Sequence, residues 1–87
     1  MEDFLKSVGI DEEGEMTDDG YVVTAESLFE LSGWYTILTQ SDDLEEDFDT
    51  SKVSADEVEI HMLGETYDIA LYGNMDSDEY TLVVTKA

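Results

Sequence analysis

The chain has 87 residues, enough for one small domain with a modest core, and 41% of them are hydrophobic, a globular rather than a disordered composition. Its 24 acids face three lysines and no arginine, for a net charge of −21, which excludes direct binding to nucleic acid or to an anionic membrane. The absence of cysteine excludes disulfides and thiolate metal sites. We expect a single compact acidic domain over residues 1–87 and, because no long apolar run or basic leader is present, a cytoplasmic location.

The first predicted element is a short helix over residues 2–8. Its spacing places Phe4, Leu5 and Val8 on one apolar side, and Gly9 is a typical residue to end it. We interpret this helix as a cap on one end of the hydrophobic core.

An acidic segment follows over residues 11–19 and contains the turn residues Asp18 and Asp19. Residues 21–24 have the aromatic and β-branched composition of a strand. Residues 15–17 are a candidate partner strand in a hairpin. The acidic segment taken alone is interpreted as a solvated loop.

Residues 27–40 are compatible with two structures. Ser27 and Glu30 have capping-box spacing, and apolar residues follow at helical intervals. Against a helix, residues 34–39 are rich in strand formers, and the Ser-Gly pair before them suits a hairpin turn. We predict the helix, with Trp34 in the core or at its rim, and keep the hairpin as the alternative.

The run from Ser41 to Asp49 contains six acids among nine residues. Leu44 and Phe48 are four residues apart, so on a helix they share one face that can anchor to a core. We therefore predict a helix over residues 42–49, capped by Ser41, with an outward ridge of carboxylates. Two unit charges 6 Å apart repel in water by about 0.7 kcal/mol, so a ridge that folding does not need indicates a partner. The ridge is formed by Asp42, Glu45, Glu46 and Asp49.

The last third of the chain carries the clearest periodicity. Side chains alternate with period two over residues 58–63, 67–72 and 80–85, which predicts three antiparallel strands. We therefore expect an α+β domain. Its predicted sheet is a three-stranded antiparallel β-meander, with an extra N-terminal strand or hairpin as an option, packed against two or three helices.

The turn between the first two of these strands sets their predicted register. Gly64 and Glu65 suit a two-residue type II′ turn. The apolar side chains then share one face, in the pairs Met62 with Tyr67, Ile60 with Ile69, and Val58 with Leu71. Turn chemistry and apolar pattern agree on this register.

No motif predicts catalysis or a metal site. His61 is the only histidine, and in the predicted register it faces Asp68 across the hairpin at about 5 Å between Cβ atoms. Neither a cysteine nor a serine in a nucleophile-elbow setting accompanies this pair. No stretch matches an EF-hand loop or a glycine-rich phosphate loop. We therefore predict no catalytic residue, no metal and no cofactor.

The remaining signal is the spacing of the acids. Carboxylates on successive helix turns lie about 5–6 Å apart and those on one strand face about 6.6 Å apart, which suits arginines and lysines that bind a phosphate track. Four clusters, at residues 11–19, 42–49, 56–59 and 76–79, supply such a track. The predicted partner is a basic nucleic-acid-binding protein. The predicted contact residues are Asp42, Asp43, Glu45, Glu46, Asp47 and Asp49, flanked by Asp18, Asp19, Asp76, Asp78 and Glu79.

In size, in charge imbalance and in its pattern of acids over an apolar scaffold, the whole chain resembles the small acidic phage proteins that act as DNA mimics. These include anti-CRISPR proteins, anti-restriction proteins and inhibitors of uracil-DNA glycosylase, and they share no motif. The resemblance implies a non-catalytic inhibitor in the bacterial host cytoplasm that blocks the basic channel of a CRISPR effector. Alternative targets are a restriction enzyme, a uracil-DNA glycosylase or a nucleoid protein.

Two rival interpretations do not involve mimicry. Proteins adapted to high salt are also acidic and poor in lysine, and a halophile-adapted acidic adaptor domain fits the composition. We expect such proteins to spread their acids more evenly and to retain arginine. A chaperone-like adaptor that docks on a basic protein is the other rival. Clustering of the acids and the absence of arginine favour mimicry.

Overall fold

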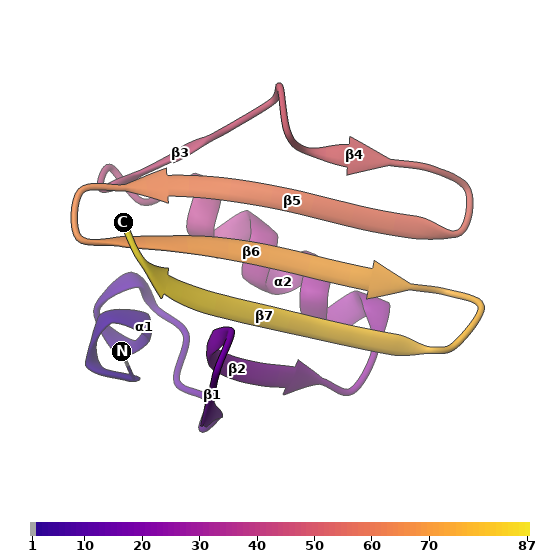
Figure 1. The fold of residues 1–87 in the computed structure, drawn as a ribbon, viewed down its shortest axis with the longest axis horizontal. Helices are drawn as coiled ribbons and strands as arrows, with labels where there is room; N and C mark the ends of the chain where they lie inside the picture. The colour runs from indigo at the N-terminus through magenta and orange to yellow at the C-terminus, as the bar shows by residue number, and fades with distance from the viewer. Residues whose placement is uncertain (1) are drawn as a thin grey trace.

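A computed structural model describes residues 2–87 of the chain. Two helices and seven strands form in these residues, shown in Figure 1. In chain order they are α1 (Glu2–Val8), β1 (Glu15–Thr17), β2 (Gly20–Ala25), α2 (Leu28–Thr39), β3 (Leu44–Glu46), β4 (Lys52–Val53), β5 (Glu57–Gly64), β6 (Tyr67–Asn74) and β7 (Glu79–Lys86).

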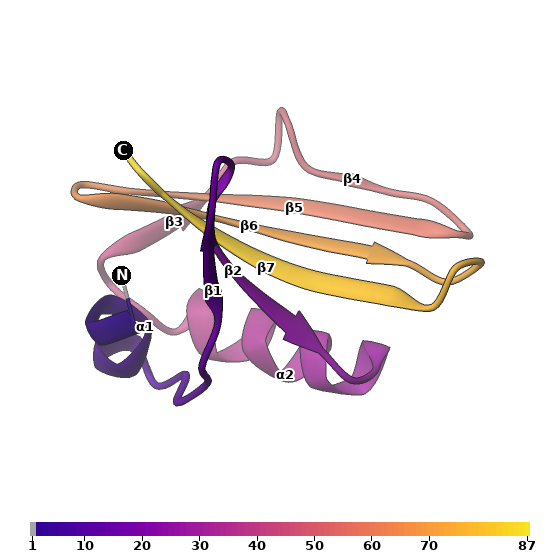
Figure 2. The same ribbon diagram turned by 60° about the horizontal axis from the view of Figure 1, so that its bottom comes forward.

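All described strands join one antiparallel sheet in the order β1-β2-β7-β6-β5-β3, and β4 also pairs with β5. Both helices lie on one face of this sheet, and no element of residues 2–87 covers the other face (Figure 2). The predicted α+β class is confirmed. The sheet is wider than the predicted meander, because β1, β2, β3 and β4 extend it on both sides.

The helix-covered face of the sheet carries the core. The chain buries no polar or charged side chain among the described residues, so the core is wholly apolar. Burial of these apolar side chains is the main contribution to the stability of the domain. Its largest fully buried side chains include Leu5, Leu38, Met62, Ile69, Leu71 and Leu82.

The helix prediction for the segment after Ser27 is confirmed, and the hairpin alternative is wrong. Ser27 is the N-cap of α2, and its hydroxyl accepts a hydrogen bond from the Glu30 backbone N–H at 3.3 Å. Leu31, Trp34 and Leu38 are buried against the sheet at helical spacing. The N-cap and the apolar stripe therefore determine the structure of this segment, and they outweigh the β propensity of its residues.

Helix α1 also forms as predicted. Gly9 ends it with a φ of 107°, a left-handed conformation that favours glycine, and the Ile10 N–H donates to the Leu5 carbonyl at 2.9 Å. The proposed partner strand for β2 is confirmed as well, because β1 pairs Glu15 with Val22.

The predicted register of the β5–β6 hairpin is wrong by two residues. Met62 pairs with Ile69 rather than Tyr67, and the two residues outside the strands are Glu65 and Thr66. Gly64 does not have the positive φ of a type II′ turn; a Cβ at Gly64 would lie 2.3 Å from the Tyr67 carbonyl oxygen, so glycine lets the strands approach. Because side chains alternate with period two, a slip of two keeps the apolar residues on the predicted face.

The predicted helix over residues 42–49 is absent. Asp42 and Asp43 form a turn, β3 follows over Leu44–Glu46, and a second turn spans residues 48–50. Leu44 is buried and pairs with Gly64, but Phe48 is 77% exposed and anchors nothing. Strand pairing along the edge of β5 therefore prevails over the helical spacing of two apolar residues.

Candidate protein-interaction surface

The acidic ridge predicted along residues 42–49 does not exist as one surface. Neighbouring residues on a strand point to opposite sides, which separates Glu45 from Glu46. Glu46 turns toward α2, where its carboxylate accepts a hydrogen bond from the Tyr35 hydroxyl at 2.5 Å. Glu45 is exposed and pairs with Leu63 of β5. These two acids therefore do not form one ridge on a single face of the domain.

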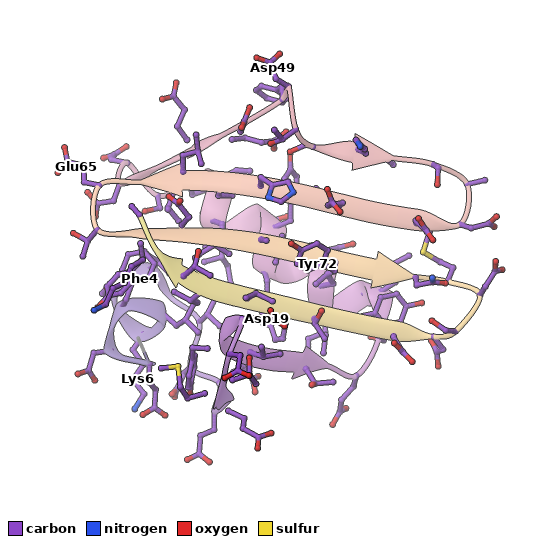
Figure 3. The ribbon with its side chains drawn as sticks, viewed as in Figure 1. Phe4, Lys6, Asp19, Asp49, Glu65 and Tyr72 are labelled. Atoms are coloured by element: carbon purple, nitrogen blue, oxygen red, sulfur yellow. The ribbon has the colours of Figure 1, made fainter. Side chains whose placement is uncertain are left out.

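Asp47 and Asp49 belong to the loop after β3. The Asp47 carboxylate accepts hydrogen bonds from the Asp49 N–H at 3.2 Å and from the Thr50 hydroxyl at 2.8 Å, and its backbone N–H donates to the His61 carbonyl at 2.8 Å. Asp47 therefore shapes the loop, whereas Asp49 is exposed at the loop tip, as Figure 3 shows.

The other predicted contact residues occupy separate ends of the domain. Asp42 and Asp43 line a depression beside α1, together with Asp3 and Glu65. Three acids lie exposed at the connection between β6 and β7, and two more lie at the β1–β2 turn. These are Asp76, Asp78 and Glu79 at the first position, and Asp18 and Asp19 at the second.

The open face of the sheet, defined here as the face opposite α1 and α2, carries a row of three apolar residues and one histidine across four strands. The register places Val22 of β2 beside Val83 of β7, Val83 beside Ala70 of β6, and Ala70 beside His61 of β5. All four are half-buried although no element of residues 2–87 covers them. We call these four residues the apolar row.

The open face is hollowed and its border is acidic. A depression of about 630 Å³ includes the apolar row and reaches Asp19 and Asp68. A second hollow, which shares His61 and Leu63 with the first, is lined by three acids and one lysine: Asp47 and Asp49 of the β3–β4 loop, Glu59 of β5 and Lys52 of β4. The β1–β2 turn and the β3–β4 loop both rise on this side of the sheet (Figure 2). A concave surface with an apolar floor therefore lies between acidic borders.

Glu59, His61 and Tyr72 form a cluster beside the apolar row. His61 Nε2 lies 3.0 Å from Glu59 Oε2, and the His61 and Tyr72 rings meet edge to face with centroids 6.1 Å apart. Tyr72 lies over the middle of the open face, with Asp19 close by, in Figure 3. The predicted pairing of His61 with Asp68 is wrong, because the two-residue slip places Ala70 opposite His61.

Burial on the open face, and then the charges of Glu59 and Asp19, raise the pKa of Tyr72 above its usual value of 10.0. The tyrosine hydroxyl is therefore neutral at pH 7 and lies in a negative potential from acids on two different elements. A cationic group placed at this point would be attracted by both carboxylates.

The His61 ring has no nucleophile beside it among the hydrogen bonds of residues 2–87. The Ser51 hydroxyl accepts from the His61 backbone N–H at 3.0 Å, and the side chain bonded to the ring is Glu59. An activated nucleophile needs the ring nitrogen on the attacking hydroxyl. Residues 2–87 also contain no group of three or more side chains placed to hold a metal ion.

Almost none of the charge is neutralised within the domain. Within residues 2–87, no lysine nitrogen lies within 4.0 Å of a carboxylate oxygen, and the single histidine–carboxylate contact joins His61 to Glu59. Six of the 24 acids are half-buried, the others are exposed, and all three lysines are exposed. The carboxylates are thus available to cations from outside the domain.

The open-face residues were missed as contact residues at the sequence level, although a signal for them exists. Ala70, Tyr72 and Val83 occupy outward positions of strands whose inward positions are also apolar. In a strand with one solvated face, polar residues at outward positions alternate with apolar residues at inward positions. Apolar residues at outward positions therefore indicated a face with a second use.

Comparisons of the chain with protein-family models, with curated proteins and with solved structures find no match. Neither helix described in residues 2–87 is long and apolar enough to cross a membrane.

Proposed function

We propose that the protein is a non-catalytic inhibitor that mimics the charge of DNA and occupies the basic nucleic-acid-binding channel of a defence nuclease. A CRISPR effector is the favoured target. Such effectors hold nucleic acid in a positively charged channel and read a short duplex motif with arginines. A restriction enzyme, a uracil-DNA glycosylase and a nucleoid protein present similar basic surfaces and are the alternative targets.

The observation that carries this proposal is the unpaired charge. The fold rests on an apolar core, and the carboxylates lie outside it with no lysine paired to them and one histidine contact in residues 2–87. Clustered carboxylates repel one another and disfavour the compact state. This repulsion lowers the stability of the domain and is not offset by ion pairs with lysines inside residues 2–87. An external basic partner is therefore the interaction that the acids favour.

The density of charge is close to that of a DNA duplex. The longest extent of the domain is 32 Å, and the chain carries a net charge of −21. A duplex with one charge per 1.7 Å carries about 19 charges over that length. A basic channel shaped for DNA therefore meets a comparable number of negative charges on this domain.

Charge of this size also accelerates encounter. Complementary potentials raise association rate constants from a neutral 10⁵–10⁶ M⁻¹s⁻¹ to as much as 10⁸–10⁹ M⁻¹s⁻¹ at low salt. The complex should form quickly and weaken as salt rises, because the interaction is screened over a Debye length of about 10 Å at 0.1 M.

An order-of-addition experiment tests the proposal. The protein is mixed with a guide-loaded Cas9-type effector before or after target DNA, and DNA binding and cleavage are measured at low and high salt. In parallel reactions a restriction enzyme and a uracil-DNA glycosylase replace the effector. We expect inhibition of at least one of these proteins when the inhibitor is added before DNA, and none when DNA already fills the channel. Equal binding with the channel filled would overturn mimicry and favour an adaptor.

A further inference from the structure

We propose that the open face of the sheet docks an amphipathic α-helix of the basic partner, with the helix along the apolar row and its arginines on the acidic border. This inference rests on the proposed function, because that function supplies the basic partner. It moves the main contact away from residues 42–49 to residues of β2, β5, β6 and β7.

The dimensions of the apolar row match a short helix. The row crosses four neighbouring strands, β2, β7, β6 and β5. Three spacings of about 4.8 Å give a length of about 14 Å, which equals between two and three turns of helix at 5.4 Å per turn. Apolar residues at i, i+4 and i+7 of a partner helix span about 10.5 Å at 1.5 Å per residue. This length covers the three apolar positions of the row, Val22, Val83 and Ala70.

Small side chains in the row permit close approach. Ala70 and Val83 form its centre, and both are neighbours across the β6–β7 pair. Larger side chains would hold a helix away from the sheet, whereas this floor allows its apolar stripe to lie against β6 and β7. Covering these half-buried side chains removes apolar surface from water, which favours docking.

The border supplies the charge complementarity. In the row next to the apolar row, Thr81 pairs with Tyr72 and Tyr72 pairs with Glu59. On the other side of the apolar row, Asp68 pairs with Thr85. Arginine suits this border because its guanidinium stacks on an aromatic ring and binds a carboxylate through two parallel hydrogen bonds.

Other occupants fit the face less well. A second copy would bring the acidic borders together and add like-charge repulsion. Nucleic acid and anionic lipid carry the wrong sign. An extended segment forms its backbone hydrogen bonds at a sheet edge rather than on a sheet face. A helix with basic residues on both sides of an apolar stripe satisfies the floor and the border together.

Two peptide probes and two variants test the proposal. One alanine-rich peptide of about 15 residues has leucines at i, i+4 and i+7 with arginines on both sides of this stripe. The second has the same composition in scrambled order. Thr81→Arg fills the open face, whereas Thr36→Arg makes the same change of residue and charge on the exposed surface of α2. Near-ultraviolet circular dichroism verifies that both variants are folded.

We expect the helical peptide to bind at least about tenfold more tightly than the scrambled one, a difference of about 1.4 kcal/mol. Thr81→Arg should remove this preference and Thr36→Arg should retain it. In the wild-type protein, methyl NMR signals of Val22, Ala70 and Val83 should shift with the helical peptide, a readout that needs no variant. Equal binding of both peptides, or shifts confined to other methyl groups, would overturn the proposed docking.

The two proposals fail in distinguishable ways. If wild-type protein blocks DNA binding by its target and Thr81→Arg blocks it as well as Thr36→Arg, the docking inference is wrong and charge mimicry stands. If the wild-type protein displaces DNA from none of the tested proteins, the proposed function is wrong whatever the peptides do.

Discussion

The two faces of the sheet contribute differently to the stability of the fold. Leu82 and Val83 are neighbours in β7, yet Leu82 is fully buried under the helices and Val83 is half-buried on the open face. The core beneath the covered face contains no buried charged side chain among residues 2–87, and the open face combines an apolar row with an acidic border. One face is therefore sufficient to hold the domain together, which leaves the other available for a partner.

The largest expected difference between the two faces is in the loss of stability when a core residue and a neighbouring open-face residue are truncated. Leu82→Ala should lower the free energy of unfolding by about 2–5 kcal/mol, because it leaves a cavity in the core. Val83→Ala removes less volume at an uncovered site and should cost about 1 kcal/mol or less. Urea denaturation of both variants gives these values. Equal losses would show that the open face is as important for folding as the covered face.

The adjacent acids of β3 give a second pair. Glu46→Lys removes the acceptor of the Tyr35 hydroxyl and should lower stability by about 1 kcal/mol. Glu45→Lys makes the same charge change at an exposed position and should leave stability within about 0.5 kcal/mol of wild type. Thermal unfolding of the two variants measures the difference. A larger loss for Glu45→Lys would contradict the assignment of the two side chains to opposite faces.

Added salt should act with opposite sign on folding and on binding. Screening relieves repulsion among the unpaired carboxylates, so the domain should be folded at ordinary ionic strength and melt at a higher temperature in molar salt. A gain of about 1 kcal/mol corresponds to a rise of about 4–8 °C for a domain of this size. The affinity for a basic partner should fall over the same range. A chain that is unfolded below molar salt would favour halophilic adaptation instead.

The smallest expected effect is the alkaline titration of Tyr72. Burial, then Glu59 and Asp19, raise its pKa above 10.0 in the folded protein. Its contribution to stability is therefore fully present below pH 10, the unfolded value, and is lost as pH rises through the folded pKa. Ultraviolet absorbance of wild type against Tyr72→Phe isolates this ionisation. A Tyr72 midpoint at or below 10 would contradict the negative potential on the open face.

Local chemistry predicted much of the fold. The glycine after Val8, the cap at Ser27 and the period-two segments at the C-terminal end each specify an element through neighbouring residues, and these elements form. The predictions failed where long-range pairing decides the structure. Leu44 pairs with Gly64, twenty positions along the chain, and no local pattern in the acidic run indicates that contact.

The candidate site was less predictable than the fold. Period two distinguishes the faces of a strand, but it does not distinguish registers that differ by two residues. The predicted partner of His61 was therefore Asp68 instead of Ala70. The density of acids in residues 42–49 led to the prediction of a single contact ridge, yet β3 turns Glu45 and Glu46 to opposite sides. The apolar row forms only because β2, β7, β6 and β5 are neighbours in the sheet. No short-range sequence pattern predicts this strand order.

Carboxylate footprinting of the complex with the inhibited target locates the face of the domain that binds the partner. Carbodiimide labelling and mass spectrometry compare each acid in the free and bound protein. We expect protection of Glu59, Asp68 and Asp19 on the open face, with Glu2 and Glu30, on the two helices, labelled as in the free protein. Protection of the helix acids with unchanged labelling of the open face would contradict the assignment of the open face as the contact surface.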